Sequence, residues 1–175
     1  MNINEKKVKR LELYHRSIDA AYQHLKDVQY SDDNDKVFMA LKSLLDLIFS
    51  ADEMHFSPKY HVIKDNDNDG KYLNGLRYAA NLLKHEKICF EVHQLNTTPL
   101  IRFPLVIPEE GIQMGVIQTE WIKVDTLPNS KRENDLNFIK QKQIYNECLV
   151  GKVIFHAIDL GIKFLNKEKE KFIKK

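Results

Sequence analysis

The chain has few of the residues that mark several protein classes. Its two cysteines, Cys89 and Cys148, are far apart and form no CxxC pair, which argues against a disulfide framework or a cysteine-based zinc site. The longest apolar-rich stretches, residues 37–51 and 148–165, are interrupted by charges, so neither suits a membrane span. No apolar run follows the first lysines, as a secretory signal would require. We therefore expect one domain over residues 1–175 that is cytoplasmic and has no membrane partner.

The net charge of +2 is too small to mark a nucleic-acid-binding protein by itself. Basic residues still gather near both ends of the chain: Lys6, Lys7, Lys9, Arg10 and Arg16 at one end, and Lys163, Lys167, Lys169, Lys171, Lys174 and Lys175 at the other. These clusters suit the rim of an RNA site. Glutamates interrupt both clusters, however, so solubilising chain ends are the favoured alternative.

Apolar residues recur at helical spacing in four segments, which cover residues 4–29, 37–54, 71–86 and 134–169. The polar break from Tyr30 to Asp35 supplies capping side chains for the second segment. This pattern predicts a mainly α protein, built as a four-helix up-down bundle.

Between the third and fourth helical segments, the hydrophobic pattern changes to the alternation of β-strands. Three short extended segments are predicted at residues 88–92, 100–107 and 116–124, and the prolines of the middle one place it at an edge or make it irregular. We expect a small β-rich insertion over about residues 88–125. Its apolar residues either present a surface to a partner protein or close a small core of their own.

The stretch before the third helix looks like a loop with an acidic turn. Residues 56–61 have the composition of a loop, and His55 and His61 match no regular spacing of metal ligands. The acidic turn matches the first half of an EF-hand calcium loop at four residues: Asp65, Asp67, Asp69 and Gly70. The twelfth position of such a loop needs a bidentate glutamate, but here it is Leu76. We therefore favour a helix-capping turn and expect no metal.

A polar stripe on the third helix carries the clearest functional signal. Helical spacing puts five of its residues on one face, namely Asn74, Arg77, Asn81, Lys84 and His85. A base, a fixed cation and an amide on one face suit phosphate chemistry. Two structural alternatives stay open: a solvated hydrogen-bonded ladder, or a pairing of Arg77 with an acid such as Asp46 or Asp159 on a neighbouring helix.

The sequence from Gly75 to Glu86, GLRYAANLLKHE, resembles the motif helix of the HEPN superfamily. The resemblance implies a small helical bundle with an arginine and a following histidine on one helix. Many members are described as metal-independent endoribonucleases, often dimeric and often parts of toxin or phage-defence systems. In the family pattern four to six residues separate the arginine from the histidine, and a polar residue such as asparagine commonly follows the arginine directly. Here seven residues separate Arg77 from His85, and Tyr78 follows Arg77.

The resemblance also implies roles for the stripe. His85 would be the acid or base, Arg77 and Lys84 would hold the phosphate, and Asn81 and Asn74 would contact the ribose or orient the histidine. Cleavage through the 2′-hydroxyl needs a base, an acid and donors for the charged transition state. One helix supplies one histidine, so we expect a homodimer, with RNA as substrate and no cofactor. The alternative is a catalytically inactive HEPN-like binding or interaction module, an antitoxin-like or regulatory partner of another protein.

Overall fold

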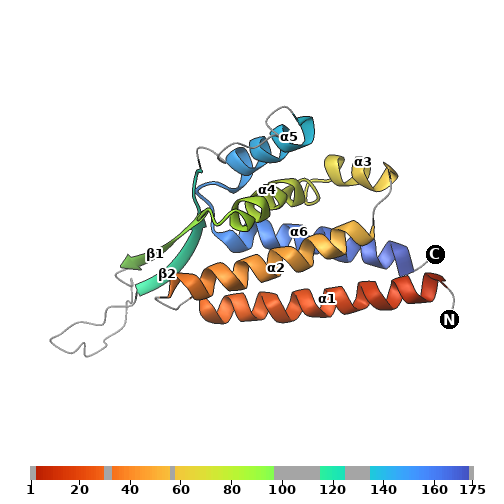
Figure 1. Cartoon of the computed structure of the whole chain (residues 1–175), viewed down its shortest axis with the longest axis horizontal. Coiled ribbons are helices and arrows are strands. Elements are labelled where there is room, and N and C mark those ends of the chain that lie inside the picture. Colours follow the sequence, from red (N-terminus) through yellow and green to blue (C-terminus); the bar gives the residue numbers. More distant parts are fainter. Residues whose placement is uncertain (1–2, 30–32, 56–57, 97–114, 125–134, 174–175) are drawn as a thin grey trace, which may run out of the picture.

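The computed structural model describes residues 3–29, 33–55, 58–96, 115–124 and 135–173. Over these residues the chain is mainly helical, as expected, with one small sheet (Figure 1). In chain order the elements are α1 (Ile3–Val28), α2 (Asn34–Met54), α3 (Pro58–Asn66), α4 (Tyr72–Lys84), β1 (Phe90–Asn96), β2 (Gly115–Trp121), α5 (Leu136–Ile144), the π-helical turn η1 (Tyr145–Leu149) and α6 (Ile154–Ile173).

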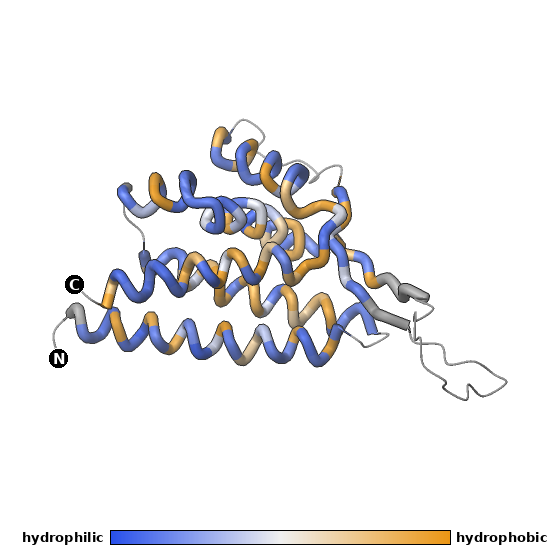
Figure 2. Tube along the Cα trace, turned by 180° about the vertical axis from the view of Figure 1, so that it is seen from behind, coloured by the Kyte–Doolittle hydropathy of each residue, from blue (hydrophilic) through white to orange (hydrophobic). Residues whose placement is uncertain are grey.

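Helices α1, α2, α4 and α6 share the hydrophobic core. Helix α2 begins after Asp33, whose carboxylate accepts hydrogen bonds from the backbone N–H groups of Asp35 and Lys36. Its fully buried side chains recur at helical spacing: Val37, Leu41, Leu44, Leu45 and Ile48. Figure 2 shows hydrophobic and hydrophilic positions alternating along these helices, as expected for helices that are each buried on one face.

Helix α3 was not expected from the sequence. The prediction of a loop over residues 56–61 is wrong from Pro58 onward, because α3 begins at Pro58 and ends at Asn66. Proline suits the first turn of a helix, where its missing N–H would have no helical partner. Since α3 adds a short helix between α2 and α4, it brings further side chains toward the polar stripe of α4.

The acidic turn between α3 and α4 is tied to neighbouring helices. The Asp67 carboxylate accepts hydrogen bonds from the backbone N–H groups of Asp69 and Gly70. A hydrogen bond from Lys167 is the main reason why the pKa of Asp67 is lowered to about 2. Three lysine–carboxylate pairs connect this region to α5 and α6: Lys140–Asp65 at 2.6 Å, Lys167–Asp67 at 2.6 Å and Lys163–Asp69 at 2.8 Å.

The single helix predicted over residues 134–169 is interrupted. Helix α5 passes into η1, and the chain then leaves the helical conformation until α6 begins at Ile154. Gly151 lies in this break with φ at 74°, a backbone conformation that glycine adopts without the steric cost of a side chain. The break lets α5 and α6 pack against α4 as separate helices.

Strands β1 and β2 form an antiparallel pair within the expected β-rich insertion, with Phe90 opposite Trp121. The pair is joined to the helices through the break before α6. The Trp121 N–H donates to the carbonyl oxygen of Lys152 at 3.0 Å, and the Gly151 N–H donates to the carbonyl oxygen of Trp121 at 2.8 Å. The middle extended segment, predicted at residues 100–107, lies outside the described residues.

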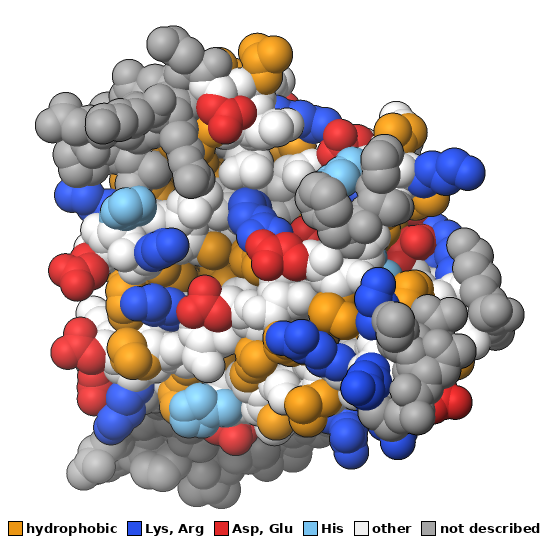
Figure 3. All heavy atoms as spheres, turned by 45° about the vertical axis from the view of Figure 1, so that its right-hand side comes forward, with side chains coloured by type: hydrophobic (Ala, Val, Ile, Leu, Met, Phe, Trp, Pro, Cys, Tyr) orange, Lys and Arg blue, Asp and Glu red, His pale blue; other side chains and the backbone are white. Residues whose placement is uncertain are grey.

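Helix α1 begins and helix α6 ends at the same end of the molecule (Figure 1). Figure 3 turns this end toward the viewer and shows lysine and arginine interleaved with aspartate and glutamate. The described residues of the two basic clusters therefore lie on neighbouring helices, α1 and α6. Among the helices of the described residues, none is long and apolar enough to cross a bilayer.

Candidate functional site

A cavity of about 520 Å³ lies where the end of α2 meets α3, α4 and α5. We call it the polar pocket. Its wall consists of Asp52 and Glu53 from α2, His61, Lys64 and Asp65 from α3, Asn74, Arg77 and Asn81 from α4, and Asn137, Lys140 and Gln141 from α5. Every one of these side chains is polar or charged, so the cavity suits a polar ligand.

Asp52 organises the inner wall of the polar pocket. It is only 4% exposed, and its carboxylate accepts a hydrogen bond of 2.6 Å from the Tyr60 hydroxyl. The Lys64 Nζ lies 2.9 Å from Asp52 Oδ2, and the Arg77 Nη2 lies 3.2 Å from the same oxygen. Burial and the Asp52 charge raise the pKa of Tyr60, so its hydroxyl keeps the proton that it donates. A buried carboxylate needs such partners because an unpaired charge in the interior is strongly destabilising.

Arg77 is held between two carboxylates. Besides the contact with Asp52, its Nη1 lies 3.0 Å from Glu53 Oε1, and its guanidinium carbon lies 3.9 Å from the centre of the Phe49 ring. The Arg77 side chain is 27% exposed, whereas Glu53 is 65% exposed. The cation is therefore fixed in the wall, and Glu53 is the partner that solvent reaches most easily.

The charges of the pocket wall cancel. Lys64, Arg77 and Lys140 provide the cations, and Asp52, Glu53 and Asp65 provide the carboxylates. Burial works to raise the pKa of Asp65, but hydrogen bonds from Lys140 and from the Asn74 amide hold it below its usual value. The uncharged donors and acceptors of the wall come largely from four amides: Asn74, Asn81, Asn137 and Gln141.

The structure divides the stripe predicted from the sequence. Asn74, Arg77 and Asn81 line the polar pocket, as one helical face should. Lys84 lines a smaller adjoining hollow of about 290 Å³ together with Arg77 and Asn81. His85 lines neither cavity; it is exposed at the end of α4, where its backbone N–H bonds to carbonyl oxygens of the last turn. Neither of these two cavities therefore brings Arg77 and His85 together.

Arg77 does pair with acids of a neighbouring helix, but not with those named from the sequence. Its partners are Asp52 and Glu53 of α2. Asp46 lines the smaller hollow, and Asp159 accepts a hydrogen bond from the Tyr22 hydroxyl. An ion pair between Arg77 and a neighbouring helix is therefore present, as the structural alternative expects, but its acids are at the end of α2.

Sequence reasoning missed the pocket residues that α3 and α5 supply. On α3 these are His61, Lys64 and Asp65, and on α5 they are Asn137, Lys140 and Gln141. Both sets follow the same spacing of three and then one, which puts polar side chains on one face of a helix. That signal is present in the sequence, but the loop predicted over residues 56–61 covers the start of α3, and helical spacing does not show that α5 packs against α4.

Among the described residues, no group of three or more histidine, cysteine, aspartate or glutamate side chains is arranged to hold a metal ion. Comparisons with protein-family models, curated proteins and solved structures found no match to this chain. The geometry of the pocket therefore has to carry any functional conclusion.

Proposed function

We propose that the chain is a catalytically inactive HEPN-like binding module, built as a single domain on a four-helix up-down bundle of α1, α2, α4 and α6. Its polar pocket binds one phosphodiester of an RNA segment without cutting it. The proposal rests on the contacts of Arg77 and the position of His85, the two residues expected to catalyse cleavage. Arg77 is bound to two carboxylates, and His85 lies outside the pocket.

Cleavage would need more than the stripe of α4 provides. A general base must come within hydrogen-bond reach of the 2′-hydroxyl while cationic donors hold the phosphate. His85 lines neither the polar pocket nor the adjoining hollow, both of which Arg77 lines. In the family pattern a polar residue such as asparagine commonly follows the arginine directly, whereas Tyr78 follows Arg77 here. Both observations favour binding over catalysis.

An anion can still enter the pocket by replacing Glu53. This carboxylate is mostly exposed, so its ion pair with Arg77 contributes little, on the order of 0.2–1 kcal/mol. Asp52 would keep the Lys64 ammonium as its counter-charge and the hydrogen bond from the Tyr60 hydroxyl. Without Glu53 the wall carries three cations against two carboxylates, which matches the single negative charge of a phosphodiester. The amides of the wall can then bond to ribose and base.

The test measures binding and cutting of a fluorescein-labelled single-stranded RNA in EDTA, by fluorescence anisotropy and by gel. We expect binding without cleavage. Glu53→Ala should tighten binding about two- to fivefold, because it removes the competing carboxylate. Arg77→Ala should weaken binding about tenfold or more, because it removes a charged donor. His85→Ala should leave both readouts unchanged.

Glu170→Ala is the matched control, since it removes a glutamate of α6 that does not line the pocket. Circular dichroism checks that each variant is folded. The proposal fails if RNA does not bind, or if Glu53→Ala and Arg77→Ala change the affinity no more than Glu170→Ala does.

A metal-independent endoribonuclease is the second candidate, and one observation favours it. His61 of α3 lines the same pocket as Arg77 and Asn81, so a histidine from a different helix stands near the expected phosphate ligands. In this version His61 rather than His85 would move the proton, and a homodimer would not be needed to bring a histidine to the site. Cutting in EDTA that is lost in His61→Ala and kept in His85→Ala would establish this candidate. Cutting that is lost in His85→Ala would instead support the dimeric site predicted from the sequence.

A further inference from the structure

Strand β1 has one edge that no described strand covers. The Ile122 N–H donates to the Cys89 carbonyl oxygen at 3.0 Å, which makes these two residues a hydrogen-bonded pair. Because such pairs alternate along an antiparallel ladder, the backbone groups of Phe90 and Val92 point away from β2. Among the described residues, none forms a backbone hydrogen bond with these outward groups.

The outer edge of β2, in contrast, is paired with the chain before α6. There the outward N–H and carbonyl groups of Trp121 bond to Lys152 and Gly151, and Glu120 forms a β-bridge with Val153. The chain therefore covers one edge of its small sheet with the break before α6 and leaves the edge of β1 open over the described residues. An uncovered edge is a ready template for another extended segment.

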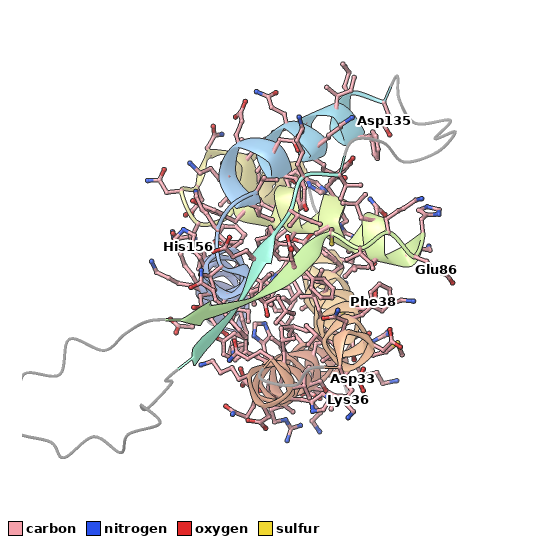
Figure 4. All side chains as sticks on the ribbon, turned by 90° about the vertical axis from the view of Figure 1, so that its left-hand side faces the viewer. Asp33, Lys36, Phe38, Glu86, Asp135 and His156 are labelled. Atoms are coloured by element: carbon pink, nitrogen blue, oxygen red, sulfur yellow. The ribbon has the colours of Figure 1, made fainter. Side chains whose placement is uncertain are left out.

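A groove of about 630 Å³ runs beside this open edge, and we call it the edge groove. Its apolar residues are Phe38, Ile88, Phe90, Val92 and Ile122. Ile88 is 61% exposed, so its side chain adds accessible apolar surface to the groove. Figure 4 shows Phe38 on α2 and Glu86 beyond α4 on the same side of the molecule.

The rim of the edge groove is acidic. It carries the carboxylates of Asp35 and Glu86. Glu86 also has φ at 56°, a left-handed conformation that costs a residue other than glycine about 1–2 kcal/mol. Glu86 belongs to the turn that ends α4, in which the Lys87 N–H donates to the Leu82 carbonyl oxygen at 2.9 Å, and this turn places the Glu86 carboxylate at the rim.

We propose that the open edge of β1 binds an extended segment of a partner protein, in which apolar residues alternate with lysine or arginine. The backbone of the segment would pair with the outward groups of Phe90 and Val92. Its apolar side chains, on one face, would enter the edge groove, and its cations would meet the acidic rim. The carboxylates of Asp35 and Glu86 would repel a nucleic acid, so the edge groove and the polar pocket would bind different kinds of ligand.

The test selects peptides from a displayed random library on the full chain, and then measures the affinity of the enriched peptides by fluorescence anisotropy. We expect enrichment of alternating apolar and basic residues. Val92→Pro should weaken binding about tenfold or more, because it removes an outward N–H while leaving the bonds to β2 in place. Ile88→Asp should have a similar effect through the groove, and Glu86→Lys should weaken basic peptides in particular.

Leu136→Asp serves as the control, because Leu136 is 81% exposed on α5 and does not line the groove. The proposal is overturned if no peptide is enriched, if acidic peptides are enriched, or if binding is the same in Val92→Pro and Ile88→Asp as in Leu136→Asp. Sedimentation of the chain alone tests a second copy as the occupant. A dimer that Val92→Pro dissociates would mean that β1 pairs with its own copy instead of a partner.

Discussion

At the scale of single residues, Asp52 holds donors from two other helices: Tyr60 and Lys64 of α3, and Arg77 of α4. Asp52→Ala leaves the Lys64 ammonium buried without its counter-charge, and breaking such a buried pair costs about 3–5 kcal/mol. Denaturant unfolding measures the loss. Glu53→Ala is the neighbouring control, and its exposed ion pair predicts a loss of about 1 kcal/mol or less. Equal losses in the two variants would contradict the central role of Asp52.

The same residues show what the sequence could predict about the site. Helical spacing alone placed Asn74, Arg77 and Asn81 on one face, and they do line one cavity. It also placed His85 on that face, yet α4 ends at Lys84 and His85 lies where the chain is leaving the helix. Spacing describes an ideal helix and does not say where the helix stops. Nor could it show that Glu53, from another helix, would bond to Arg77.

At the scale of elements, Gly75 allows α4 to approach the end of α5 and η1. A Cβ at this position would lie 2.7 Å from Leu149 Cδ1 and 3.3 Å from the backbone nitrogen of Tyr145. Gly75→Ala should therefore destabilise the protein by about 1–3 kcal/mol through overpacking, although alanine favours helices by about 1 kcal/mol. Thermal and denaturant unfolding test this.

Gly161→Ala on α6 is the comparison. Its Cβ would meet only the side-chain ends of Leu73 and Leu76, at 3.0 and 3.1 Å, which can move by a few tenths of an ångström. The gain in helix propensity should then offset most of the cost. If Gly75→Ala were as stable as Gly161→Ala, the close approach of α4 to η1 would not depend on glycine.

The sequence pattern predicted the bounds of some helices more accurately than those of others. Helices α1, α2 and α4 follow clear apolar periods with capping or turn residues between them, and their predicted bounds lie close to the observed ones. Helix α3 was missed because Pro58 was interpreted as a loop residue, whereas it opens the helix. The long C-terminal helix was predicted without a break because apolar residues continue across Gly151, and the period does not reveal a local left-handed turn.

At the scale of the whole molecule, α2 separates the two proposed binding sites. Asp35 lies at the edge groove and Asp52 at the polar pocket. At about 1.5 Å of rise per residue, these positions are about 25 Å apart along the helix. We therefore expect RNA and a basic peptide to bind together, each with an affinity unchanged by the other. Anisotropy titrations of one labelled ligand, with the other at saturation, measure this. A shift beyond about twofold would mean that the two sites are coupled.

Two buried histidines connect α1, α2 and α6 and make stability depend on pH. His15 Nδ1 of α1 lies 2.9 Å from Asn166 Oδ1 of α6, and His55 at the end of α2 stacks on Tyr60. Burial, then the charge of Lys169, lowers the pKa of His15 to about 4, against smaller effects of the Asn166 hydrogen bond and of Asp19. Burial also lowers the pKa of His55, against the charges of Asp52 and Glu168.

Because the folded pKa of His15 is below the unfolded value of about 6.5, the unfolded chain binds the proton first as the pH falls. The stabilising effect of the neutral imidazole is complete above about pH 7 and is lost between pH 6.5 and 4. For His15 alone this loss should reach about 2 kcal/mol by pH 5, and His55 acts in the same direction. Urea unfolding at pH 7.5, 6 and 5 measures the slope. His15→Asn, which keeps a polar partner for Asn166, should flatten the slope; if it matches the unsubstituted chain over this range, His15 does not link the three helices to pH.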